Sequence, residues 1–157
     1  MYIHYDGKEY ERVDAAAIIK GSASFPKING LVRFYQTDNG VYIVTSVTGL
    51  PKGGGACDSP IFAMHIHDGD SCAENGTEPF PFTGTHFNPN DCAHPEHAGD
   101  LPPLFGCHGI AMSAVLTDRF TVSDILGKTV VIHERADDFK TQPSGDSGAK
   151  IACGVIQ

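Results

Sequence analysis

The segment LVRFYQTDNGVYIVTSVT, residues 31–48, decides the fold class of this 157-residue chain. Apolar and polar residues alternate over Leu31–Thr37 and again over Val41–Thr48, which is the two-residue period of a half-buried β-strand. The turn DNG at 38–40 separates the two runs, and Asn-Gly between alternating runs is the strongest short-range signal for a β-hairpin. The segment therefore predicts an antiparallel hairpin.

Strand-like patterns continue on both sides of this hairpin. The chain has 18 Gly, 10 Pro and no Trp, and such turn formers between short apolar runs favour an all-β domain. The further strands are expected at Ala15–Gly21, Ile61–His67, Ile110–Thr117, Lys128–His133 and Ile151–Ile156. We therefore predict a Greek-key β-sandwich or flattened barrel of about eight antiparallel strands.

Two long stretches, 68–103 and 134–149, lack any periodic pattern, and we expect them to be loops. Structureless stretches of this length inside a compact domain are usually functional or disordered, and the first carries three of the eight histidines. We therefore expect the chemistry to lie on these loops. The whole chain, 1–157, is one domain in size, with an N-terminal arm over 1–14.

Charge and the N-terminus limit the partners and leave the compartment open. The net charge of −8 makes nucleic acid and anionic membranes poor partners, and no run reaches the roughly 18 apolar residues that a membrane span needs. The start MYIHYDGKEY is not a signal peptide, so we expect a cytoplasmic protein unless a leader was removed. Five cysteines are an odd number, so at least one is free or pairs between chains.

Histidine is concentrated in a pattern that favours metal binding. His65 and His67 lie two residues apart on an expected strand and so share one face, while Phe62, Met64 and Ile66 face the core. A polar strand face that happens to carry two histidines is the alternative. His86, His94, His97 and Asp100 supply four ligands, which suits a tetrahedral zinc site, although solvated loop histidines would also fit. His133 ends an expected strand, and it becomes a candidate metal ligand only because the other histidines are present.

Five motifs in order carry a resemblance to a known family. They are HIH at 65–67, GTHFNP at 84–89, HAGDLP at 97–102, VVIHERADD at 130–138 and GAKIACGVI at 148–156. Read together, they resemble the copper-zinc superoxide dismutases, and the resemblance extends over nearly the whole chain from about Ala15. It implies an enzyme that converts superoxide to dioxygen and hydrogen peroxide with copper and zinc as cofactors.

The resemblance assigns roles residue by residue. It implies a copper site of His65, His67, His86 and His133, and a zinc site of His86, His94, His97 and Asp100. His86 would bridge the two metals and carry a proton in catalysis. Asp137 would hydrogen-bond one ligand of each metal and so fix their orientation. Cys72 and Cys153 would form a disulfide that leaves Cys57, Cys92 and Cys107 outside, with Cys92 open to a second disulfide or to zinc.

The chain also departs from the family pattern. Lys150 stands where the family has an arginine that guides the anion, and lysine lacks the planar fork of donors. We expect Lys150 to serve catalysis at a reduced rate. Both long loops are shorter than in the eukaryotic enzymes, and a homodimer is open, with no contact mode assigned.

Three alternatives compete with a copper-zinc dismutase. The first is a non-catalytic copper-binding or metallochaperone-like domain on the same fold, which would typically lack copper ligands. The second is a structural zinc protein with a degenerate copper site, and the third is a copper-only dismutase that has abandoned the zinc ligands. Every candidate ligand is present here, which favours the enzyme with both metals.

Overall fold

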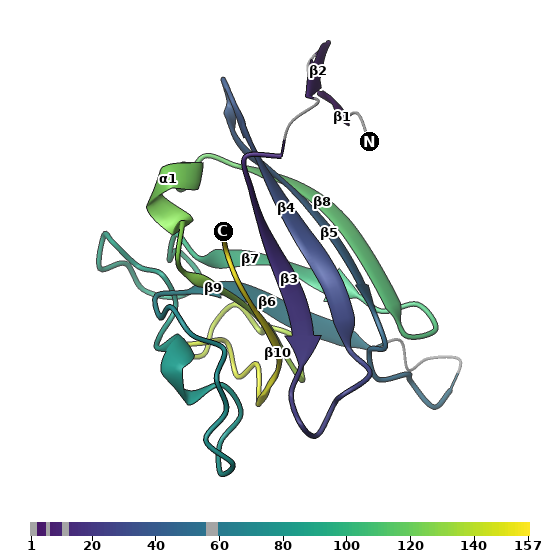
Figure 1. Ribbon diagram of the computed structural model, residues 1–157. Helices are drawn as coiled ribbons and strands as arrows, with labels where there is room; N and C mark the ends of the chain where they lie inside the picture. Colours follow the sequence, from purple (N-terminus) through teal and green to yellow (C-terminus); the bar gives the residue numbers. More distant parts are fainter. Residues whose placement is uncertain (1–2, 6, 11–12, 56–59) are drawn as a thin grey trace.

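The computed structural model describes residues 3–5, 7–10, 13–55 and 60–157, and its main body is one eight-stranded antiparallel sheet (Figure 1). The strands are β3 (Ala15–Gly21), β4 (Asn29–Thr37), β5 (Gly40–Thr48), β6 (Ile61–His67), β7 (Asp100–Phe105), β8 (Ile110–Thr117), β9 (Thr129–His133) and β10 (Lys150–Val155). Their spatial order is β7-β6-β9-β10-β3-β4-β5-β8. The two edge strands, β7 and β8, contact each other, so the sheet wraps into a nearly closed, flattened barrel. The all-β prediction is confirmed.

The predicted hairpin is β4–β5. Its register runs from Asn29 opposite Thr48 to Thr37 opposite Gly40, which places the turn where the sequence predicted it. Gly40 has a φ of 128°, and a side chain at this position would collide with the backbone of Thr117 on the neighbouring strand. Glycine is therefore required by both the turn and the close approach of β8.

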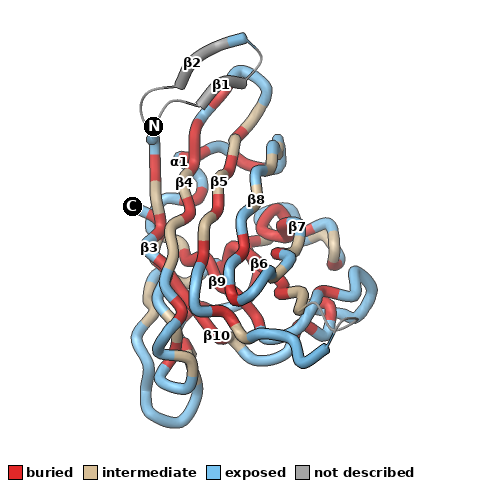
Figure 2. The backbone as a smooth tube through the Cα atoms, turned by 90° about the vertical axis from the view of Figure 1, so that its right-hand side faces the viewer, coloured by how far each residue is buried: buried red, intermediate tan, exposed pale blue. Residues whose placement is uncertain are grey.

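The core lies between the two halves of the sheet. Figure 2 shows the buried residues gathered along the strands and the exposed ones along the connecting loops. Alternate side chains point inward, for example Phe34 and Ile43 on one half and Met64 and Ile132 on the other. Full burial of side chains of this size stabilises a fold by about 1.5–3 kcal/mol each.

The prediction of a single loop over 68–103 was wrong at its C-terminal end. The strand β7 begins at Asp100 and pairs with β6, and a 3₁₀ turn spans Pro81–Thr83. Pro102 and Pro103 argued against a strand in the sequence, because proline cannot donate a hydrogen bond to a neighbouring strand. Proline is tolerated here because β7 pairs with β6 on one side only.

One short helix and two short strands lie outside the barrel pattern. The helix α1 (Val122–Ile125) is a single turn with a capping box formed by Thr121 and Asp124. The strands β1 (Ile3–Tyr5) and β2 (Lys8–Tyr10) pair only with each other among the described residues. A single domain over 1–157 with an arm over 1–14 stays a prediction. Neither helical segment in the described part of the chain is long and apolar enough to cross a membrane.

A disulfide joins Cys72 to Cys153, as the resemblance implied. It ties the start of the first long loop to β10, and Cys153 is buried against Phe80 and Val131. Within the described residues Cys92 and Cys107 are free thiols, and Cys57 lies outside them. The bridge therefore anchors the loop that leads to the histidine cluster.

Candidate metal centre

Strand β6 positions the first two histidines. Its register with β9 sets His65 opposite Val131 and His67 opposite Thr129, and the side chains at 62, 64 and 66 pack into the core. His65 and His67 consequently point out of the barrel on the opposite face. They are nevertheless buried, with 0% and 3% of their surface exposed, so the loops must cover this face.

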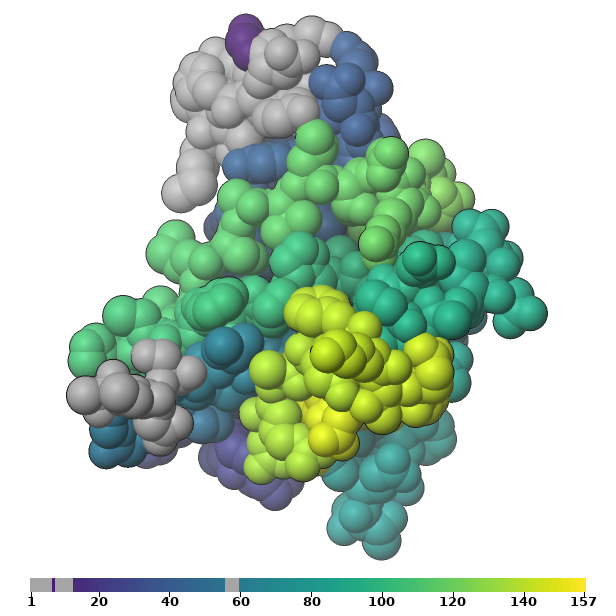
Figure 3. Space-filling view, turned by 180° about the vertical axis from the view of Figure 1, so that it is seen from behind, coloured from purple at the N-terminus to yellow at the C-terminus, as the bar shows by residue number. Residues whose placement is uncertain are grey.

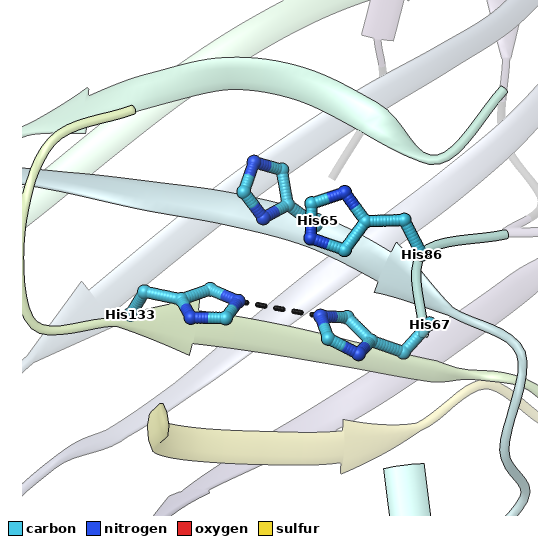
Figure 4. Close-up of side chains that lie close together, drawn as sticks. All are labelled: His65, His67, His86 and His133. Carbon is cyan, nitrogen blue, oxygen red and sulfur yellow. Dashed lines mark hydrogen bonds between the residues drawn. The ribbon is translucent and has the colours of Figure 1, made fainter. Parts of the chain in front are cut away.

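Two further histidines complete a first donor group, which is His65, His67, His86 and His133. His86 is placed by a β-bridge to His67, and His133 lies at the end of β9. One nitrogen from each of the four rings lies within 4.8 Å of the others. Figure 4 shows the four rings converging, with a 3.2 Å contact between the Nε2 atoms of His67 and His133.

A second donor group is formed by His86, His94, His97 and Asp100, all buried. The carboxylate of Asp100 lies at its centre: Oδ1 is 2.6 Å from His86 Nδ1, and Oδ2 is 3.0 Å from His94 Nδ1 and 3.2 Å from His97 Nδ1. The register of β7 on β6 places Asp100 directly opposite His65. His86 therefore belongs to both groups.

The outward hydrogen bonds of the rings decide which nitrogen faces each group. Backbone carbonyl oxygens accept from His67 Nδ1, at Gly84, and from His133 Nδ1, at Gly148, which leaves both Nε2 atoms with free lone pairs. No role had been assigned to these two glycines from the sequence, although Gly84 opens the GTHFNP motif and Gly148 opens the GAKIACGVI motif. The resulting tautomers present unprotonated nitrogens to the first group.

Asp137 likewise accepts a hydrogen bond from one ring of each donor group and so decides which ring nitrogen faces inward. Its Oδ2 accepts from His65 Nε2 and its Oδ1 from His94 Nε2, each at 2.8 Å. Burial alone would raise the pKa of Asp137, but the hydrogen bonds from His65, the backbone N–H of Phe139 and His94 outweigh it and hold that pKa below its usual range. The carboxylate therefore fixes both rings with Nδ1 turned inward.

Buried nitrogens without a hydrogen-bond partner mark where a metal would bind. They are His65 Nδ1, His86 Nε2 and His94 Nδ1. His94 Nδ1 lies 3.0 Å from Asp100 but not in hydrogen-bonding geometry. Buried polar atoms rarely stay unpaired, so these three atoms, one or two in each group, fit metal ligation. Four imidazoles suit copper, and three imidazoles with a carboxylate suit zinc.

Three rings of the first group, those of His65, His67 and His133, are also held free of protons. Burial lowers the pKa of His65, and burial with the neighbouring His133 and His86 lowers the pKa of His67 well below the ordinary value. Burial, and then His65, lowers the pKa of His133 to about 3. A metal must compete with protons for imidazole, so lowered pKa values keep these ligands available at neutral pH.

Comparison with known proteins decides the family, because the family model "Copper/zinc superoxide dismutase" matches residues 28–156. The chain belongs to the copper/zinc superoxide dismutase family. It is 32% identical over 149 residues to the enzyme of Deinococcus radiodurans, covering 83% of this chain and 78% of that one. It is 33% identical over 152 residues to the enzyme of Legionella pneumophila, with 92% and 87% covered.

Solved structures agree on the fold of this family member. The Brucella abortus Cu/Zn superoxide dismutase superposes with a TM-score of 0.74 at 24% identity, covering 92% of this chain and 100% of that one. A double mutant of a SOD-like protein from Bacillus subtilis gives 0.72 at 30% identity, with 88% and 94% covered. Together with the two donor groups, the family makes copper and zinc the cofactors of this chain.

Lys150 lies at the edge of the metal centre. A cavity of about 410 Å³ is lined by Lys150 together with His67, His86 and His133. The Lys150 Nζ donates to the carbonyl of Phe80 at 3.2 Å, and burial lowers its pKa. The cavity therefore offers a cation close to the first donor group.

Two residues that hold the second donor group had no signal in the sequence. Gln142 hydrogen-bonds the backbone of His94, and Arg119 hydrogen-bonds three carbonyls of the turn that carries His97 and Asp100. Neither belongs to a metal-ligand motif, and their partners are distant in sequence. Only the folded chain brings them to the site.

Proposed function

We propose that this chain is a superoxide dismutase that cycles copper(II)/copper(I) in the first donor group, with zinc in the second and His86 shared between them. Superoxide dismutase activity follows from membership of the family and from the paired histidine groups. The observation that supports this proposal most directly is the placement of His86. Its Nδ1 lies 2.6 Å from Asp100, while its buried Nε2 has no hydrogen-bond partner. A ring so placed can serve both groups at once.

Bound copper would supply the one-electron couple that oxidises one superoxide to dioxygen and reduces a second to peroxide, whereas zinc is redox-inert. His86 would hold a proton at Nε2, its buried nitrogen without a hydrogen-bond partner, and donate it to the reduced oxygen, while Nδ1 stays held toward Asp100. A second proton comes from water, so two superoxide anions and two protons give one dioxygen and one hydrogen peroxide.

The surrounding residues bind and orient. Asp137 and the carbonyls of Gly84 and Gly148 keep the ligand nitrogens turned inward, which reduces reorganisation during the cycle. Lys150 attracts the anion into a cavity on a chain whose net charge is −8. A local cationic field can steer an anion even when the net charge is negative.

The test of this function is the decay of superoxide after pulse radiolysis, on protein whose copper and zinc have been counted. Fast second-order decay that scales with bound copper is the expected result. Slow decay with copper fully bound would instead indicate the non-catalytic copper-binding alternative.

Replacing Lys150 with glutamine is expected to lower the second-order rate by roughly 10-fold at low ionic strength, the lower end of the range for electrostatic steering. The dependence of the rate on salt should weaken in the same variant, because screening acts on the charge that was removed. Lys150→Arg should raise the rate above that of the parent, since arginine offers a planar fork of donors.

Lys20→Gln is the matched control for Lys150→Gln. Lys20 is an exposed lysine on β3, bonded to Asn29, and removing it changes the net charge by the same amount. Equal rates for the Lys150→Gln and Lys20→Gln proteins would contradict a guiding role for Lys150.

A further inference from the structure

One short turn, residues 93–100, carries three of the four donors of the second group: His94, His97 and Asp100. This turn is held by side chains from two other parts of the chain that do not belong to either donor group. In Figure 3 the loop after β9, in yellow-green, lies beside the teal segment of the first long loop, with green β8 above it. Gln142 comes from the loop after β9, and Arg119 comes from the segment just beyond the end of β8.

Gln142 binds both backbone polar groups of a single donor residue. Its Oε1 accepts from the His94 N–H at 2.9 Å, and its Nε2 donates to the His94 carbonyl at 2.6 Å. Asp137, from the same loop, binds the ring of His94 at Nε2. The loop after β9 therefore holds His94 at three atoms, which fixes the backbone and the ring plane together.

Gly145 allows this loop to close so tightly. A side chain at Gly145 would run into the carboxylate of Asp137 and the ring of His94, and its φ of 68° lies in the left-handed region that favours glycine. The contact between the loop and His94 is therefore a close one.

Arg119 holds the remainder of the turn. Its Nη1 donates to the carbonyls of Pro95 and His97, each at 3.1 Å, and to that of Asp100 at 3.3 Å. Three carbonyls that converge on one cationic nitrogen set the curvature of the turn. That curvature decides how close the donors of His97 and Asp100 lie to each other.

We infer that Arg119 and Gln142 are positioning residues for the second donor group, and that they set how tightly it retains zinc. The inference rests on the proposed function only in taking zinc as the metal of that group. Outer hydrogen-bond partners of metal ligands typically change affinity by about 10–100-fold. Both side chains are exposed, so we expect about 10-fold for each. Copper retention should not change, because the hydrogen bonds of Arg119 and Gln142 described above go to the turn 93–100 and not to His65, His67 or His133.

The test compares Arg119→Met and Gln142→Met with the parent as fully loaded protein. Zinc transfer to a chromophoric chelator should be about 10-fold more favourable in each variant, with copper retained as in the parent. Cobalt in place of zinc should show altered visible absorption bands, because ligand geometry determines them. Arg119→Lys should restore most of the zinc retention, since an ammonium has three protons for the three carbonyls. Arg33→Met, on the outer face of β4, is the control and should behave as the parent.

Zinc transfer and cobalt spectra equal to those of the parent in both methionine variants would overturn the inference. So would equal weakening of copper and zinc, because that result would show general destabilisation rather than positioning. Circular dichroism identifies a variant that fails to fold, in which case Arg119→Lys and Gln142→Met decide the question. None of these readouts uses superoxide, so they stand or fall separately from the proposed dismutase activity.

Discussion

Replacing His86 with alanine is expected to slow superoxide decay by about 10²–10⁴-fold, the range that a positioned proton-transfer group typically contributes. The loss has two causes. His86 belongs to both donor groups, and its unpartnered Nε2 is the atom that we propose to carry the proton. The rate is measured by pulse radiolysis, normalised to bound copper.

Metal content separates the shared residue from those that serve one group. His86→Ala should weaken retention of both metals, His67→Ala that of copper alone, and His97→Ala that of zinc alone, because His86 is the one residue in the described part of the chain that belongs to both groups. His108→Asn removes an exposed histidine of the turn before β8 and should change neither metal. Unchanged turnover in His86→Ala, or loss of a single metal, would contradict the bridging role.

Opening the Cys72–Cys153 disulfide is expected to lower the free energy of unfolding by about 4–5 kcal/mol on the chain-entropy account. The two cysteines are 81 residues apart, so the bridge restricts a large loop in the unfolded chain. For a domain of this size the change corresponds to a fall in Tm of about 10–15 °C. Reduction of the disulfide, or Cys72→Ser combined with Cys153→Ala, tests this by thermal and denaturant unfolding.

The same variant should also lose part of its superoxide activity. Phe80, whose carbonyl accepts from Lys150, packs against Cys153, so releasing the loop loosens the cation at the cavity. Cys92→Ser and Cys107→Ser are the controls, because both residues are free thiols and should leave the unfolding free energy nearly unchanged. An equal Tm for the bridged and opened proteins would show that the bridge contributes nothing to stability.

The parts of the fold that follow local alternation could be predicted from the sequence. The hairpin β4–β5 is set by alternation and by the turn before Gly40, both of which are visible within twenty residues. Strand β7 could not be predicted in this way, because Pro102 and Pro103 give the segment the composition of a loop. The segment is a strand because it pairs with β6. Tertiary pairing thus overrode local propensity at this edge.

Part of the candidate site could likewise be predicted from the sequence, and part could not. The spacing of His65 and His67 on one strand indicated a shared face, whereas the grouping of His86 with both sets came from the family resemblance. Which ring nitrogen faces inward depends on distant partners such as Asp137, and the roles of Arg119 and Gln142 depend on contacts that cross the fold. Such contacts leave no periodic pattern in a single sequence.

The central claim is that one imidazole, His86, joins a copper site to a zinc site. Anomalous diffraction at the copper and zinc absorption edges, on crystals of the fully loaded protein at a dose that keeps copper oxidised, tests it most directly. We expect copper only within the first donor group, zinc only within the second, and His86 bound to both. A single metal filling both groups, or a zinc bound without His86, would contradict it.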